Sequence, residues 1–178
     1  NYNDDFAQVK KAFGDFLHRL PFYGMAVLCI DDEETARLAQ DTSRRMVTYG
    51  IDNPKADVVA TNVRQIGFQM QFDVRLPGMA DALAITLNLP GRHNVQNALA
   101  AAAVGWQLGV EGEAIARARG GFQGVGRRVH RRGESALDNG KALLVDDCGQ
   151  HRRELGAVFS AARGGWPDRR LVVAFQPH

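Results

Sequence analysis

In IGFQMQFDVRL, residues 66–76, every second side chain is apolar. A period of two is the pattern of a β-strand that buries one face and exposes the other. The same period returns over Leu83–Leu89, beyond the turn dipeptide Pro77-Gly78. These two stretches predict a half-exposed antiparallel hairpin, and we expect residues 57–63 to add a third strand.

The residues around this hairpin follow other patterns. Met25–Ile30 is a short, unbroken apolar run, which is typical of a strand covered on both faces of a parallel sheet. Val47–Ile51 is a second short strand candidate. Apolar residues at helical spacing predict helices over residues 6–20, 31–40, 95–106 and 111–119. Together these elements predict an α/β protein with a mixed sheet.

The last third of the chain predicts a second folding unit. Five glycines and four arginines fall within residues 120–133, which indicates a linker or hinge. Beyond it, Ala142–Val145 and Leu171–Phe175 are apolar strand candidates on either side of a helical pattern. This order predicts the start of a Rossmann-like β-α-β unit with parallel strands. Because one such unit cannot cover both faces of a parallel sheet, we expect the chain to be part of a longer protein.

Composition and charge narrow the class of protein. The 178 residues are 45% hydrophobic and 24% charged, as in an ordinary globular protein. No apolar run approaches the ~18–20 residues of a membrane span, and no leader segment is visible. Cys29 and Cys148 are too few for a disulfide framework and fit no zinc site, so a reducing, cytoplasmic setting is expected.

The charges are unevenly distributed along the chain. Residues 1–116 carry 10 basic and 14 acidic side chains, whereas residues 117–178 carry 12 basic and 6 acidic ones. This asymmetry is compatible with a C-terminal part that handles anions and equally with a solvated arginine-rich surface.

Three polar segments are candidates for chemistry. GRHNVQN, residues 91–97, lies where a predicted strand gives way to a helix, and backbone N–H groups at such a place suit a nucleotide or anion. An asparagine amide can match the edge of adenine, although Asn94 as a simple helix cap is the alternative. Asp146-Asp147 follows a predicted parallel strand, where open α/β sheets bind ligands, or caps the next helix. Arg127-Arg128 could grip phosphate oxygens or form a solvated loop.

Four motifs in a fixed order make the chain similar to a known family. They are Gly91-x-His93-Asn94-x-x-Asn97-x-x-Ala100-Ala101, Phe122-Gln123-Gly124-Val125-Gly126-Arg127-Arg128, Leu144-Val145-Asp146-Asp147-x-Gly149 and Ala174-Phe175-Gln176-Pro177-His178. This set resembles the Mur ligase family, and Phe16–Gly24 extends the resemblance over nearly the whole chain. The resemblance implies that residues 1–128 are the C-terminal half of a central, ATP-binding domain. Residues 129–178 would then begin the C-terminal domain.

The resemblance also implies an activity. Within the family, the motifs are most similar to those of an ATP-dependent ligase of peptidoglycan synthesis that joins L-alanine to UDP-N-acetylmuramate through an acyl phosphate. A ligase of the same family for a recycled murein peptide and a non-catalytic nucleotide-binding module are the alternatives. The expected partners are small-molecule substrates, with neither nucleic acid nor a membrane, because no aromatic platform accompanies the arginines.

The family motifs assign roles at the nucleotide. His93, Asn94 and Asn97 would hold the adenine, Arg128 would act as the catalytic arginine on phosphate, and Asp147 would contact the nucleotide from the C-terminal domain. In the family, the phosphate loop and the Mg²⁺ ligands precede the position of Asn1. We therefore expect ATP and Mg²⁺ as cofactors, no metal ligand within this chain, and no activity of the chain in isolation.

The amino-acid site departs from the family pattern. By resemblance it would include Cys148, Gln150, His151 and His178. The family's usual run Tyr-Gly-His-His-Pro is replaced here by CGQHR, residues 148–152. We therefore expect altered use of L-alanine.

Overall fold

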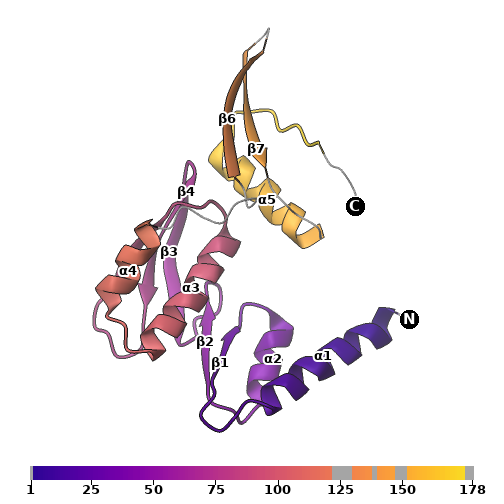
Figure 1. The fold of residues 1–178 in the computed structure, drawn as a ribbon, viewed down its shortest axis with the longest axis vertical. Coiled ribbons are helices and arrows are strands. Elements are labelled where there is room, and N and C mark those ends of the chain that lie inside the picture. Colours follow the sequence, from indigo (N-terminus) through magenta and orange to yellow (C-terminus); the bar gives the residue numbers. More distant parts are fainter. Residues whose placement is uncertain (1, 122–129, 138–139, 147–151, 175–178) are drawn as a thin grey trace. The chain divides into compact units, whose positions relative to one another are not determined.

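The computed structural model describes residues 2–121, 130–137, 140–146 and 152–174 (Figure 1). Its helices are α1 (Tyr2–His18), α2 (Glu33–Asp41), α3 (Arg92–Gln107), α4 (Gly112–Gly121) and α5 (Arg152–Gly165). Its strands are β1 (Ala26–Cys29), β2 (Met46–Gly50), β3 (Val58–Ile66), β4 (Gln69–Arg75), β5 (Leu83–Leu87), β6 (His130–Leu137) and β7 (Gly140–Asp146). The described residues separate into two compact units, those within 1–61, 74–83 and 96–115 and those within 62–73, 84–95 and 116–178.

The main sheet has five strands in the order β1-β2-β3-β4-β5, and Figure 1 shows β1, β2 and β3 side by side. β1 pairs with β2 in parallel, with Ala26 opposite Met46, and β2 pairs with β3 in parallel, with Tyr49 opposite Val58. β3, β4 and β5 are joined by connections too short for a parallel crossover, so these neighbours run antiparallel. The predicted mixed sheet is thereby confirmed.

The alternating stretch buries the expected face but contains a turn that the pattern did not predict. Three side chains of β4 are at most 3% exposed: Met70, Phe72 and Val74. Residues 66–76 are nevertheless not one strand, because β3 continues through Ile66 and the chain reverses before β4 begins at Gln69. The reversal uses Gly67 at a φ of 57°, where glycine has no steric penalty. Because the apolar residues keep a period of two across this two-residue turn, the alternation alone does not reveal the turn.

The helices lie close to their predicted positions, with two differences. α2 begins at Glu33, after Asp32, whose side chain caps the helix by accepting from the backbone N–H of Thr35 at 3.0 Å. Asp31, which the sequence placed in the helix, therefore precedes it. On α1, Leu17 is buried, but four apolar side chains are 49–65% exposed: Phe6, Val9, Phe13 and Phe16. None of the helices in the described ranges is long and apolar enough to cross a membrane.

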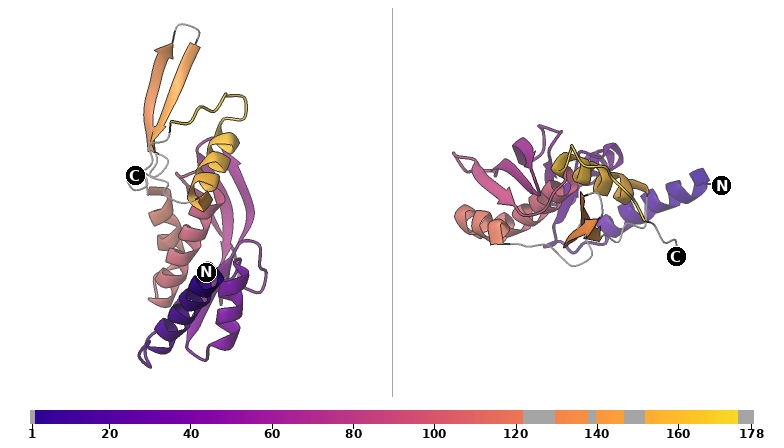
Figure 2. Two further views of the ribbon diagram at one scale, coloured as in Figure 1. Left: turned by 90° about the vertical axis from the view of Figure 1, so that its right-hand side faces the viewer. Right: turned by 90° about the horizontal axis from the view of Figure 1, so that it is seen from above.

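The predicted β-α-β unit takes another form in the described residues. β7 contains the predicted strand 142–145, but it pairs antiparallel with β6, with Leu137 opposite Gly140, and Figure 2 shows the two strands side by side. β6 begins inside the stretch that was expected to be a linker. α5 follows as predicted, whereas residues 171–174 are exposed and form no strand. A strand needs a hydrogen-bonding neighbour, and β7 finds its neighbour in the preceding segment rather than in residues 171–174.

Candidate functional site

The junction between β5 and α3 is held by a glycine. Gly91 is buried and has a φ of 94°, which residues with a side chain rarely adopt. An added Cβ would lie 2.8 Å from Cε1 of the His93 ring and 3.2 Å from Cβ of Ala161. Glycine at this position therefore allows the His93 ring to fold back over the turn.

Asn94 is tied to the same turn. Its Nδ2 donates to the carbonyl oxygen of Pro90 at 2.8 Å, and its backbone N–H donates to the carbonyl of Gly91 at 3.0 Å. A capping side chain accepts from a backbone N–H and precedes the helix, so the interpretation of Asn94 as a helix cap is wrong. Asn97 lies one turn further on α3 and is exposed. Spacings of three and four residues place Asn97 on the same side of the helix as Asn94 and His93.

A cavity of about 350 Å³ lies beside His93. Its apolar walls include Val63 and Met70 from β3 and β4 and Ala157 from α5, and its polar rim includes His93, Gln65 and Ser160. Nε2 of Gln65 donates to the carbonyl of Ala161 at 2.9 Å and so ties β3 to α5 at this wall. Arg92 also lines the cavity, so four polar side chains stand beside its apolar walls, and its volume is large enough for a small heterocycle. Of the three predicted adenine ligands, His93 lines this cavity, whereas Asn94 and Asn97 do not.

A carboxylate that the sequence reasoning missed joins three segments. Asp31 follows β1 and accepts hydrogen bonds from the backbone N–H groups of Ile51, Asp52 and Asn53 at 2.8–3.1 Å. Its Oδ2 also accepts from Nε2 of Gln96 on α3 at 2.8 Å. The place of Asp31, two residues after a parallel strand, was the signal that could have identified it.

These bonds set the charge state of Asp31. Burial by itself would raise the pKa of the carboxyl group, but the bonds from Ile51, Gln96, Asp52 and Asn53 outweigh burial. The pKa of Asp31 therefore lies below its ordinary value, and the group is ionised at neutral pH. Hydrogen bonds to an ionised acceptor are stronger than those between neutral groups.

Comparison with known proteins shows which family the chain belongs to. The family described as the Mur ligase middle domain matches residues 1–105, more than half of the chain. The chain belongs to the Mur ligase family.

Individual Mur ligases resemble the chain over all or nearly all of its length. The UDP-N-acetylmuramate–L-alanine ligase of Stenotrophomonas maltophilia strain K279a is 60% identical to it over 100% of the chain, and that of Xylella fastidiosa strain M12 is 58% identical. The chain spans 37% of the length of each of these curated relatives. The crystal structure of UDP-N-acetylmuramate-alanine ligase MurC from Thermotoga maritima matches with a TM-score of 0.76 and 25% identity, over 100% of this chain and 38% of that one. MurF from Acinetobacter baumannii shares the fold, with a TM-score of 0.70 at 23% identity over 91% of this chain and 33% of that one.

Other residues that the Mur ligase motifs singled out lie outside the described residues. They are Arg127, Arg128, Asp147, Cys148, Gln150, His151 and His178. Their roles and the domain boundary at residues 128 and 129 stay predictions. Asp146 is described: its Oδ2 accepts from Nη2 of Arg132 at 2.7 Å, so it forms an ion pair between β7 and β6.

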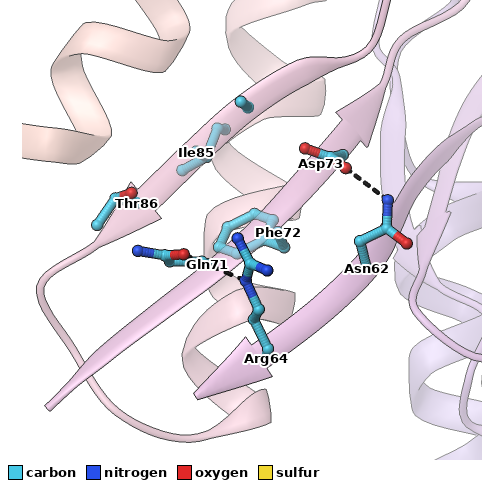
Figure 3. A pocket seen from close by; sticks show the side chains of 8 residues that line it. Asn62, Arg64, Gln71, Phe72, Asp73, Ile85 and Thr86 are labelled. Atoms are coloured by element: carbon cyan, nitrogen blue, oxygen red, sulfur yellow. Dashed lines mark hydrogen bonds between the residues drawn. The ribbon is translucent and has the colours of Figure 1, made fainter. Parts of the chain in front are cut away.

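A second hollow, of about 540 Å³, lies on the outer face of β3, β4 and β5 (Figure 3). Nδ2 of Asn62 donates to Asp73 at 2.7 Å, and Nε of Arg64 donates to Oε1 of Gln71 at 3.2 Å. Both bonds join β3 to β4 and are ordinary cross-strand pairs of a solvated sheet face. None of the site residues predicted within the described ranges lines this hollow. Within those ranges, no three His, Cys, Asp or Glu side chains come together to hold a metal ion.

Proposed function

We propose that this chain is a segment of an ATP-dependent ligase that joins L-alanine to UDP-N-acetylmuramate. The observation that carries the proposal is the identity of 58–60% to proteins of that name over the whole chain. The full-chain match to the Thermotoga maritima ligase supports it independently, since that comparison rests on the fold. A ligase for a recycled murein peptide is the less favoured alternative, because the relatives at 58–60% identity carry the name of the L-alanine ligase.

The proposed reaction has two steps. The γ-phosphoryl group of ATP passes to the muramyl carboxylate, which gives ADP and an acyl phosphate. The amine of L-alanine then attacks the acyl carbon, an amide bond forms, and inorganic phosphate leaves while the nitrogen loses a proton. In this scheme Arg128 holds the transferred phosphate, which carries negative charge through both steps.

The junction at the start of α3 is proposed to hold the adenine. The amide of Asn94 has two N–H bonds, and the contact with Pro90 uses one of them. The second N–H and Oδ1 are the donor and acceptor that an adenine edge requires. His93 and Asn97 lie on the same side of the helix, and the cavity beside His93 has the size and apolar walls that suit a base.

The remaining roles extend this scheme to the whole protein. We propose that residues 1–128 belong to the central domain and residues 129–178 to the C-terminal domain, with Asp147 closing on the nucleotide. Cys148, Gln150, His151 and His178 would form the amino-acid site. Mg²⁺ is proposed as the second cofactor, with its ligands in a part of the protein outside this chain. The cytoplasm is proposed as the place where the protein works.

The test uses the full-length protein that contains this chain. It is incubated with ATP, Mg²⁺ and UDP-N-acetylmuramate, with L-alanine, glycine or a murein tripeptide as the acceptor, and both ADP and the amide product are measured. Product formed with L-alanine and dependent on ATP is expected. Product formed with the tripeptide but not with L-alanine would show a ligase for a recycled murein peptide. ATP binding without any amide product would indicate a non-catalytic module.

A further inference from the structure

Asp31 is the point at which the end of β1, the loop after β2 and helix α3 are fastened together. The backbone N–H groups of residues 51, 52 and 53 all point to its carboxylate. A Cβ on Gly50 would lie 2.5 Å from Oδ1, so the chain can approach this closely only because residue 50 is glycine. Nδ2 of Asn53 donates in turn to the carbonyl of Ile30 at 3.1 Å, which closes the loop on the strand.

The hydrogen bond from Nε2 of Gln96 to Oδ2 of Asp31 links this assembly to α3, and it joins residues 65 positions apart. It sits between Val95, which is fully buried, and Asn97, which is exposed. Successive residues of a helix are rotated by about 100° around its axis. A bond that fixes the direction of Gln96 therefore also fixes the direction in which Asn97 points.

The next turns of α3 are held in place by apolar packing. Ala98, Leu99 and Ala102 are buried and hold the helix by apolar contact, which tolerates small rotations and shifts. A charge-assisted hydrogen bond has a preferred direction and length, so it restricts those motions where packing does not.

From these contacts we propose that the Asp31–Gln96 hydrogen bond positions Asn97 for the nucleotide, with Asp31 and Gln96 as positioning residues that do not themselves touch the substrate. This inference rests on the proposed ATP site at the start of α3. Loss of the bond lets the first turns of α3 rotate, which weakens ATP binding and leaves the chemical step and the amino-acid site unaffected.

The variants are made in the full-length protein. Gln96→Leu removes the donor and keeps a residue that favours helix. Gln96→Lys returns a donor to Asp31. Gln107→Leu is the matched control, because Gln107 also makes a tertiary hydrogen bond from α3, accepting from Nη2 of Arg45 at 3.2 Å, but at the far end of the helix.

Two measurements are made on each variant: the Kd for ATP by calorimetry, and the KM for ATP, the KM for L-alanine and kcat in the ligase assay. Gln96→Leu should raise both ATP constants about tenfold, with kcat and the KM for L-alanine within about twofold of wild type. Gln96→Lys should recover most of the loss, and Gln107→Leu should leave the ATP constants unchanged.

The inference is overturned if Gln96→Leu binds ATP like wild type, if Gln107→Leu weakens binding equally, or if kcat falls while the ATP constants stay fixed. Its failure differs from failure of the proposed function. A wild-type protein that binds ATP without forming the amide would refute the function, and the Kd values would still decide the positioning role. A wild-type protein that binds no ATP would refute both.

Discussion

Replacement of Gly91 by alanine would test how the junction before α3 is held. At a φ of 94° an alanine is strained by about 1–3 kcal/mol. Its Cβ would also lie 2.8 Å from Cε1 and 2.9 Å from Nδ1 of the His93 ring, so the ring must leave its place over the turn. Overpacking of this kind adds about 1–2 kcal/mol. Gly91→Ala should therefore lower the free energy of unfolding by about 2–5 kcal/mol.

Thermal unfolding of the full-length protein measures this change. About 2–4 °C per kcal/mol for a domain of ~150–250 residues predicts a fall in Tm of about 6–12 °C for ~3 kcal/mol. Gly67→Ala is the matched control, because its φ of 57° is also positive but nothing lies within 4 Å of the added Cβ. It should cost ~1–2 kcal/mol from backbone strain alone. If Gly91→Ala lowers Tm no more than Gly67→Ala does, the contact with the His93 ring contributes nothing and the reasoning is refuted.

Three more predictions concern Asp31, the arginine pair and the amino-acid loop. Because the folded-state pKa of Asp31 lies below its unfolded value, its stabilisation is present above pH ~4 and lost as the pH falls through the folded pKa, so urea unfolding from pH 6 to pH 3 should show a smaller loss of stability in Asp31→Asn than in wild type. The neighbouring Cys29 and Tyr49 keep their protons in that range, since burial raises the pKa of both, which leaves Asp32 as the other acidic neighbour that could titrate. Equal losses of stability in the two proteins would count against the hydrogen-bond network of the Asp31 carboxylate. Arg128→Lys should lower kcat/KM for ATP at least about tenfold, because an ammonium cannot reproduce the planar fork, whereas Arg127→Lys should be milder; wild-type kinetics for Arg128→Lys would remove that residue from the site. The full-length protein should bind ATP normally but use L-alanine poorly, and an about tenfold lower KM for L-alanine is expected when the family residues are restored by Cys148→Tyr, Gln150→His and Arg152→Pro; efficient L-alanine turnover without the restoration would contradict this.

The parts of the fold that local pattern determines were predictable from the sequence. The apolar run Met25–Ile30 predicted a strand, and β1 lies within it, although Val27, Leu28 and Cys29 are only partly buried. The alternation over β4 identified which side chains are buried, because a pleated strand turns successive residues to opposite faces. The turn at Gly67 was not predicted, since the apolar period continues across it. Strand β6 was not predicted, because its polar residues show no alternation.

The candidate site was predictable where a motif is continuous in sequence and not where it depends on distant contacts. His93, Asn94 and Asn97 share one side of a helix because of their spacing alone. The bond from Asn94 to Pro90 also lies within the motif, but its direction, from the amide to a carbonyl, depends on the tight junction at Gly91. The bond between Asp31 and Gln96 spans 65 positions and required the sheet to be assembled before it could be recognised.

The way in which Asp31 holds the loop after β2 has a consequence for which substitutions this region tolerates. Its carboxylate contacts main-chain N–H groups, and every residue except proline supplies the same N–H group. The side chains at positions 51 and 52 can therefore change without loss of the contact, provided that neither becomes proline. Gly50 has no such freedom, because any Cβ there would collide with the carboxylate. A mutational scan of the loop should consequently find one intolerant position at 50 immediately beside two permissive ones.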